Sequence, residues 1–170
     1  MIYNREYETM AREEREQLQI ERLQASLNRV YRNVAFYREA FDREKLSPDS
    51  IRSLKDVSRL PFTTREDLRK SYPYNMFAVP IRDIVRLHST SGTTRSPIIV
   101  GYTRNDIRVW ASLVARVLTA VGIGEDDFIQ IAFPYTLTTG GLGFHYGAER
   151  IGASVIPASS SDLRRQITVM

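Results

Sequence analysis

Residues 84–103 read IVRLHSTSGTTRSPIIVGYT, which places a hydroxyl-rich turn between two apolar runs. The first run, at 84–89, predicts a strand, and the second run begins the next element. Five serine and threonine residues surround Gly92 ahead of Arg95. Hydroxyls and exposed backbone N–H groups suit phosphate oxygens, glycine lets the backbone approach an anion closely, and arginine adds a fork of charged donors. The turn at 89–97 therefore predicts a phosphate-binding loop.

A flexible Ser/Thr turn between two strands is the alternative interpretation of the same composition. The turn is not a Walker A motif, because that motif requires G-x-x-x-x-G-K-[ST] and the chain contains no Gly-Lys pair. The G-x-G-x-x-G pattern is also absent. P-loop NTPases and Rossmann dehydrogenases are therefore disfavoured.

Strand and helix patterns alternate downstream of the turn. Thr103 and Asp106 form a T-x-x-D start, and the helix that follows should run to about residue 121. We then expect a buried strand at 128–132, a helix from the TTGGLG loop to about residue 151, and a strand at 153–156. This alternation predicts an α/β fold with a parallel sheet and crossover helices. On the first helix, core packing is expected for Trp110 among Val109, Leu113 and Val117.

The last residues begin a further helix. Ser159 to Asp162 is a good helix start, and the chain stops about two turns later at Met170. A parallel sheet with so few strands leaves an open apolar edge. We therefore expect a truncated domain; the alternative is a short natural domain whose edge is covered by the N-terminal helices.

The first half of the chain is charged and helical in pattern. Apolar residues recur mostly at three- and four-residue steps and predict an amphipathic helix: Leu18, Leu23, Leu27, Val30, Tyr31 and Val34. Further helices are expected at 36–46, from Ser53 to Leu60, and after the T-x-x-D start at Thr64. The sequence thus predicts two domains, a helical N-terminal region at 1–80 and a partial α/β domain with the phosphate loop at 81–170.

Composition excludes several classes of site. The net charge of +4 comes with charges of mixed sign along residues 5–45, whereas nucleic-acid binding concentrates Lys and Arg on one face. The chain has no cysteine, and its two histidines, His88 and His145, lack metal-ligand spacing. There is no apolar signal-peptide core and no run near the ~18 apolar residues of a membrane span. We expect a cytoplasmic protein with no metal site in this chain and no nucleic-acid or membrane partner.

The turn resembles the phosphate-binding signature of adenylate-forming enzymes, [ST]-[ST]-G-[ST]-[ST]-G-x-P. The matching residues are, in order, Thr90, Ser91, Gly92, Thr93, Thr94 and Pro97. Arg95 stands where the family usually has glycine and Ser96 where it has lysine, so the positive charge is moved back by one residue. This departure puts the strength of nucleotide binding in question.

Longer stretches resemble the phenylacetate–CoA ligase family of these enzymes. They are LQIERLQASLNRVYRNVAFYREAFD, LPFTTREDLRKSYPYNMFAVP, VGYTRNDIRVW and GGLGFHYGAERIGASVIP. The resemblance covers nearly the whole chain but only the N-terminal portion of such ligases. It implies a helical region followed by the first part of the parallel-stranded adenylate-forming N-terminal domain, also called the AMP-binding domain.

The resemblance also implies an activity. Such ligases join a carboxylate to ATP, giving an acyl-adenylate and pyrophosphate, and coenzyme A then takes the acyl group as a thioester; Mg²⁺ accompanies the ATP. The implied phosphate-binding residues are Ser89, Thr90, Ser91, Gly92, Thr93, Thr94 and Arg95. The implied acyl-pocket residues are Phe133, Tyr135, Thr138, Gly140, Gly141 and His145. The catalytic lysine of the family would lie beyond Met170, so the chain alone is expected to be inactive.

Several residues keep a structural alternative. Arg65, at the helix start after Thr64, is a second candidate anion contact or a surface arginine. Phe133 and Tyr135 could line a pocket for an aryl group or pack in the core. His145 could contact the carboxylate or nucleotide, or have a structural role. The resemblance implies an aromatic carboxylic acid as substrate and allows a homodimer of the full-length protein. The family commonly has an aromatic residue where Thr138 stands, so another aromatic acid, or a small acid, is an alternative substrate.

Two other functions remain open at this point. One is a noncatalytic remnant, or interaction module, whose helical N-terminus binds a partner chain. The other is an adenylating enzyme that loads a carrier protein instead of coenzyme A. The departures at Arg95 and Ser96 give some weight to the first of these alternatives.

Overall fold

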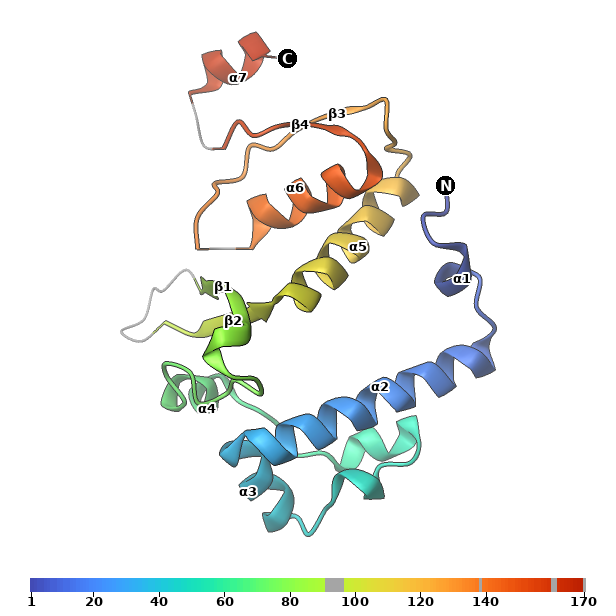
Figure 1. The fold of residues 1–170 in the computed structure, drawn as a ribbon, viewed down its shortest axis with the longest axis vertical. Coiled ribbons are helices and arrows are strands. Elements are labelled where there is room, and N and C mark those ends of the chain that lie inside the picture. The colour runs from blue at the N-terminus through green and yellow to red at the C-terminus, as the bar shows by residue number, and fades with distance from the viewer. Residues whose placement is uncertain (91–96, 138, 160–161, 170) are drawn as a thin grey trace. The chain divides into compact units, whose positions relative to one another are not determined.

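The chain folds as two compact units (Figure 1). The computed structural model describes residues 1–90, 97–137, 139–159 and 162–169. The helical unit comprises residues 9–84 and 97–99, and the α/β unit comprises residues 1–8, 85–90 and 100–169. None of the helices in the described residues is both long and apolar enough to cross a membrane.

Two helices supply most of the core of the helical unit, α2 (Arg12–Asn33) and α3 (Ala35–Arg43). Leu27 from α2 packs in one cluster with Phe41 from α3 and with Ile51. The Tyr31 ring meets the Phe41 ring edge-on, with centroids 5.9 Å apart. Burial of each large apolar side chain stabilises the fold by about 1.5–3 kcal/mol. The predicted amphipathic helix is therefore confirmed, with its stripe facing α3.

Helix α3 ends at Arg43, earlier than the predicted end at Leu46. Lys45 takes a left-handed φ of 52°, and the Leu46 N–H donates to the Phe41 carbonyl at 2.9 Å. This bond closes the helix in a Schellman arrangement. The predicted helix extends past the observed end of α3 because the apolar spacing continues through the residues that form the cap.

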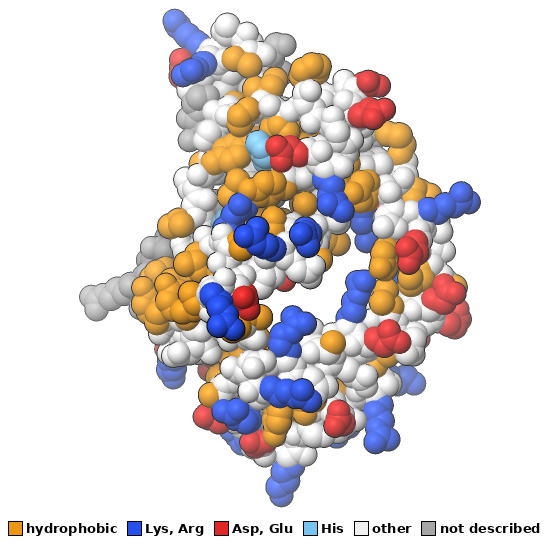
Figure 2. Space-filling model, viewed as in Figure 1, with side chains coloured by type: hydrophobic (Ala, Val, Ile, Leu, Met, Phe, Trp, Pro, Cys, Tyr) orange, Lys and Arg blue, Asp and Glu red, His pale blue; other side chains and the backbone are white. Residues whose placement is uncertain are grey.

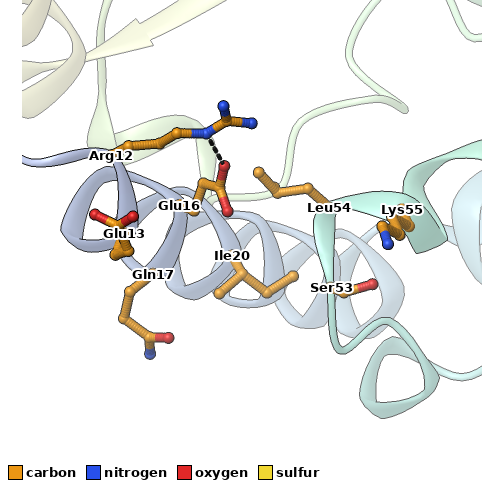
Figure 3. A pocket seen from close by; sticks show the side chains of 8 residues that line it. All are labelled: Arg12, Glu13, Glu16, Gln17, Ile20, Ser53, Leu54 and Lys55. Atoms are coloured by element: carbon orange, nitrogen blue, oxygen red, sulfur yellow. Dashed lines mark hydrogen bonds and ion pairs between the residues drawn. The ribbon is translucent and has the colours of Figure 1, made fainter.

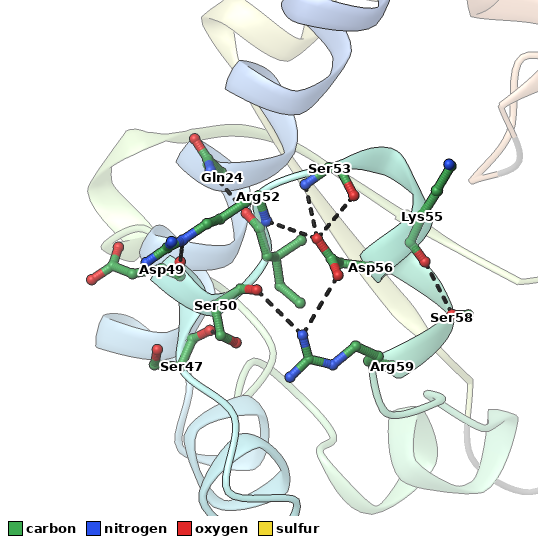
Figure 4. A network of polar contacts seen from close by, with 11 residues as sticks. Gln24, Ser47, Asp49, Ser50, Arg52, Ser53, Lys55, Asp56, Ser58 and Arg59 are labelled. Carbon is green, nitrogen blue, oxygen red and sulfur yellow. Dashed lines mark hydrogen bonds and ion pairs between the residues drawn. The ribbon is translucent and has the colours of Figure 1, made fainter.

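A short 3₁₀ helix, η2 (Leu54–Arg59), begins where Ser53 was predicted to cap a helix. The Asp56 carboxylate accepts from the backbone N–H groups of Ser53 and Arg52 at 2.9 and 3.1 Å (Figure 4). Another 3₁₀ turn, η1 (Pro48–Ser50), precedes it. The capping prediction is confirmed, although the helix is of the tighter 3₁₀ type.

Thr64 and Asp67 form the capping box of α4 (Arg65–Lys70), as predicted. The Asp67 N–H donates to Thr64 Oγ1 at 3.2 Å, and the Asp67 carboxylate accepts from the Thr64 N–H at 2.8 Å. Hydrogen bonds from the hydroxyl and then the backbone of Thr64 hold the pKa of the Asp67 carboxyl below its usual 3.8.

Thr64→Ala is expected to destabilise the helical unit by about 1 kcal/mol at neutral pH, the usual cost of losing an N-cap. A carboxyl whose pKa is lower in the folded state stabilises the fold at pH values above its unfolded-state pKa. That stabilisation is lost as the pH falls through the folded-state pKa. The difference between wild type and Thr64→Ala should therefore shrink below pH 3.8. Urea unfolding at a series of pH values measures it.

Thr63→Ala is the control, because the Thr63 hydroxyl donates to Tyr37 at 3.2 Å and not to a carboxylate. It should leave the pH dependence of unfolding unchanged. A destabilisation by Thr64→Ala that stays constant down to the acid limit would contradict the assignment of the box.

In the α/β unit, β3 (Phe128–Gln130), α6 (Gly140–Ile151) and β4 (Ser154–Ile156) form a strand–helix–strand crossover. The two strands are parallel, with Phe128 opposite Ser154 and Gln130 opposite Ile156. This part of the predicted parallel sheet is confirmed. The start of β3 is not buried as predicted: Phe128 is 75% exposed, because the described residues do not cover that face of the strand.

The strands β1 (Ile84–Ser89) and β2 (Ile99–Thr103) pair as a separate two-stranded sheet. A 3₁₀ turn, η3 (Ile81–Asp83), precedes β1. The expectation of a single sheet through all the strands is therefore not met in the described residues. At the end of β1 the Ser89 N–H donates to the Leu137 carbonyl at 3.1 Å, so a loop takes the place of a neighbouring strand.

Helix α5 (Arg104–Ala120) packs on α6 through glycines. A Cβ added at Gly143 would lie 2.6 Å from the Trp110 ring, and one added at Gly147 would lie 2.4 Å from Val114 Cγ1. The two helices can therefore approach closely only because these positions lack a side chain. Thr103 and Asp106 form the predicted capping box of α5. The short helices α1 (Arg5–Glu8) and α7 (Leu163–Val169) complete the α/β unit.

One face of α5 stays apolar and exposed. Val109, Leu113 and Val117 are 50%, 51% and 59% exposed, so they do not surround Trp110 in a core as expected. Trp110 itself is half-buried and packs against Gly143, Tyr102 and His88. The face packed on α6 carries Trp110, Val114 and Leu118, which lie against Gly143, Gly147 and Ala148. Apolar side chains also reach the surface elsewhere on the face drawn in Figure 2.

Candidate functional site

The base of the hydroxyl-rich loop lies at the end of β1. The inward-facing positions of this strand carry Arg86 and His88, whereas Val85 and Leu87 are 44% and 42% exposed. Arg86 donates to the Tyr146 hydroxyl at 2.6 Å and lies over the Tyr146 ring at 4.9 Å. Arg86 therefore joins β1 to α6, close to the start of the loop.

The structure describes only the first two residues of the predicted phosphate-binding set, Ser89 and Thr90. Ser89 is half-buried and Thr90 is exposed. The other predicted residues lie outside the described part of the chain: Ser91, Gly92, Thr93, Thr94 and Arg95. Their contact with phosphate stays a prediction.

The carbonyl of Leu137 joins this loop base to the loop after β3. It accepts from the Ser89 N–H at 3.1 Å, and His88 Nδ1 lies 2.8 Å from it. A carbonyl can only accept, so Nδ1 carries the proton. The two loops that sequence reasoning assigned to phosphate and to acid thus share one anchoring atom.

The predicted acyl-pocket loop presents Tyr135 to α6. Tyr135 Oη lies 3.1 Å from His145 Nδ1, and His145 Nε2 lies 3.2 Å from a Glu149 carboxylate oxygen. With Nε2–H donating to Glu149, Nδ1 accepts a hydrogen bond from the Tyr135 hydroxyl. Burial and then the Glu149 charge raise the pKa of Tyr135 above its usual 10.0, so the phenol stays neutral and its oxygen can accept from a ligand.

The same loop has an aromatic wall. The Phe133 and Phe144 rings stack with centroids 5.8 Å apart and planes 5° apart. A Cβ at Gly141 would lie 3.0 Å from the Pro134 carbonyl oxygen, so the space at Gly141 is taken by the loop backbone. A Cβ at Gly140 would meet only the Phe133 ring, at 3.8 Å.

The acyl-pocket set is thus described except for Thr138, which lies outside the described residues. The structure brings Phe133, Tyr135, Gly140, Gly141 and His145 together where the loop meets the start of α6. Whether they contact an acid stays a prediction.

Sequence reasoning missed a hollow of about 330 Å³ beside this site. Its lining residues are Tyr102, Asp106, Val109, Trp110, Leu113 and Thr139. The Tyr102 and Trp110 rings stack 5.5 Å apart, and His88 meets both edge-on. Nothing in sequence spacing signalled this group, because the residues come from β2, α5 and the turn before α6.

The helical unit holds the remaining candidates. Arg65 is exposed at the first position of α4, and its anion contact stays a prediction. A hollow between α2 and η2 is lined by charged side chains, among them Arg12 and Glu16, which pair at 2.8 Å (Figure 3). Both side chains are largely solvent-exposed, and such pairs contribute little to stability. Among the described residues no three His, Cys, Asp or Glu side chains gather as metal ligands.

Comparison with known proteins decides the family. The phenylacetate-coenzyme A ligase of Escherichia coli (strain K12) is 49% identical over 159 residues, which cover 94% of this chain. Those of Aromatoleum evansii and Thermus thermophilus are 46% and 44% identical over 96% and 100% of it. The chain belongs to the phenylacetate–CoA ligase family. No family model matches it.

As a member of the phenylacetate–CoA ligase family, the chain corresponds to an N-terminal portion of its relatives. It spans 36%, 37% and 38% of the lengths of the ligases from E. coli, A. evansii and T. thermophilus.

Solved structures agree with this family. A 2-hydroxyisobutyryl-CoA ligase in complex with 2-HIB-AMP and CoA in the thioesterification state matches 91% of the chain with a TM-score of 0.84 and 32% identity. The same ligase in the postadenylation state matches 88% with a TM-score of 0.80 and 31% identity. These matches cover 34% and 32% of the solved chains. The predicted fold class, the first part of an adenylate-forming ligase domain after a helical region, is confirmed.

Proposed function

We propose that the full-length protein carrying this chain is an ATP-dependent carboxylate–CoA ligase. It would join the acid to ATP, releasing pyrophosphate, and then pass the acyl group from the adenylate to the thiol of coenzyme A, releasing AMP. The observation that carries the proposal is the shared anchor at Leu137, which joins the base of the hydroxyl-rich loop to the aromatic loop. A phosphate group and a carboxylate bound at these two loops would lie at one edge of the unit.

The donor chemistry of the loop suits a polyphosphate. A carboxylate is a poor electrophile, and AMP is a far better leaving group than oxide, so the enzyme must hold the triphosphate and stabilise its charge. The Ser89 N–H is already bound to Leu137, which leaves the Ser89 hydroxyl for phosphate. We assign the remaining residues of the predicted set to the same role: Thr90, Ser91, Gly92, Thr93, Thr94 and Arg95.

Mg²⁺ would accompany ATP through the nucleotide's own phosphate oxygens. Among the described residues, no three acidic, histidine or cysteine side chains gather to hold it directly.

The acid we propose is aromatic. The Phe133–Phe144 stack offers an aryl-sized apolar surface, and the neutral Tyr135 hydroxyl, held by His145, supplies a polar contact at its edge. The names of the relatives support the same class of acid. The solved 2-hydroxyisobutyryl-CoA ligase takes a small aliphatic acid, which makes that acid the informative competitor.

We further propose that residues 1–170 alone do not turn over, because the catalytic lysine of the family has no counterpart assigned in them. Residues 1–80 would form the helical region and residues 81–170 the first part of the AMP-binding domain. The enzyme would work in the cytoplasm, where ATP and coenzyme A are available.

Pyrophosphate release by the full-length protein tests the proposal. We expect release that depends on both ATP and acid, faster with phenylacetate than with 2-hydroxyisobutyrate, and thioester formation when coenzyme A is added. No acid-dependent release from folded protein would overturn the ligase assignment and favour a noncatalytic remnant. Release followed by transfer only to a carrier protein would favour the carrier-loading alternative.

A further inference from the structure

The two histidines of the chain both contact the loop after β3 through Nδ1. His145 meets the Tyr135 hydroxyl, a side-chain contact within the predicted acid pocket. His88 meets the Leu137 backbone, and it lies on β1, 49 residues away in sequence. No pattern in the sequence assigned a role to His88.

The His88 ring is held by two aromatic neighbours and one hydrogen bond. It is only 3% exposed, and it lies edge-on to Tyr102 and Trp110 with centroids 5.3 and 5.8 Å apart. Nε2 is buried and has no hydrogen-bond partner among the described residues. Because a carbonyl can only accept, the tautomer that fits this environment carries its proton on Nδ1. This tautomer holds the Leu137 carbonyl at 2.8 Å.

The Leu137 carbonyl also accepts from the Ser89 N–H, so one oxygen receives donors from two consecutive residues of β1. Ser89 begins the predicted phosphate loop, and Leu137 lies two residues after Tyr135 in the aromatic loop. Loss of the His88 donor would leave the Ser89 N–H as the remaining described bond at this carbonyl. The described link through this carbonyl would then rest on one hydrogen bond instead of two, and the two loops would hold each other less firmly.

We propose that His88 is a positioning residue that fixes the acid-binding loop against the base of the phosphate loop. The role rests on the proposed ligase function. His88 does not touch either substrate; it acts through Leu137 and Ser89. Because both loops depend on the same anchor, its loss weakens the binding of ATP and of acid together.

Two substitutions of similar polarity separate this role from mere packing. Asparagine places its amide N–H₂ near the position of Nδ1, whereas glutamine carries it one bond farther, toward the position of Nε2. In the full-length ligase we expect His88→Gln to raise the KM for ATP and the KM for acid by about tenfold each, the loss that one hydrogen bond carries. His88→Asn should keep both KM values near those of the unmodified enzyme.

Leu118→Ala serves as the control for stability alone, because Leu118 is buried in the core of the same unit and has no contact with either loop in the described cluster. It should lower the unfolding temperature and leave both KM values unchanged. If the unmodified ligase is active and the His88→Asn and His88→Gln variants have equal KM values, the positioning role is overturned and the proposed function stands. An unmodified ligase without acid-dependent pyrophosphate release would overturn the proposed function and this role with it.

Discussion

Gly147→Ala is expected to destabilise the α/β unit by about 2 kcal/mol, because overpacking costs about 1–3 kcal/mol and sometimes more. The new Cβ would lie 2.4 Å from Val114 Cγ1 and 3.1 Å from the Val114 carbonyl carbon. Valine is stiff at χ1, so its side chain has no easy way to move aside. Alanine would add about 1 kcal/mol of helix propensity, which offsets only part of this loss.

The fluorescence of Trp110 during urea unfolding measures the change. Trp110 is the single tryptophan of the chain, and it lies at the same α5–α6 interface, against Gly143. Gly124→Ala is the matched control, since its added Cβ would meet no atom within 4 Å. The control should stay within about 0.5 kcal/mol of wild type. Equal midpoints for the two variants would show that α5 and α6 do not pack as closely as described.

The double variant Thr93→Val and Thr94→Val is expected to weaken ATP binding by the full-length protein by at least about 100-fold. A hydrogen bond to a charged group contributes about 1.5–3 kcal/mol, and each tenfold in affinity corresponds to about 1.4 kcal/mol. Valine keeps the shape and β-branching of threonine and removes only the hydroxyl. Calorimetric titration with ATP measures the change.

Thr168→Val is the control for this pair, because the Thr168 hydroxyl bonds to the Arg164 carbonyl within its own helix at 2.8 Å. It should leave ATP affinity unchanged. Unchanged affinity in the double variant would mean that the hydroxyls of the turn do not hold phosphate, and the assignment of the loop would fail.

Local features of the fold could be predicted from the sequence. The capping boxes at Thr64 and Thr103 form as expected because their bonds span only three residues, and nothing distant competes for those groups. The β3–α6–β4 crossover also follows from alternating patterns and a short connection. The resemblance of the stretches around the turn at 89–97 identified the family before any tertiary contact was known.

Tertiary structure alone decided which residues meet. An apolar stripe indicates that a helix has a buried face, but it does not say which neighbour covers it, and Val109, Leu113 and Val117 turn out to be exposed. The Tyr102–Trp110 hollow joins residues from separate elements, so no spacing could reveal it.

The starts of helices, the family and the hydroxyl-rich turn can be predicted from the amino-acid sequence, because each depends on residues close together in the chain. The contacts of His88 and Ser89 with the Leu137 carbonyl, and of Tyr135 with His145, became visible only in the folded chain. Hydrogen bonds are short and directional, so such a meeting depends on how two distant backbones are placed to within a fraction of an ångström. Residue types and their spacing do not carry that information.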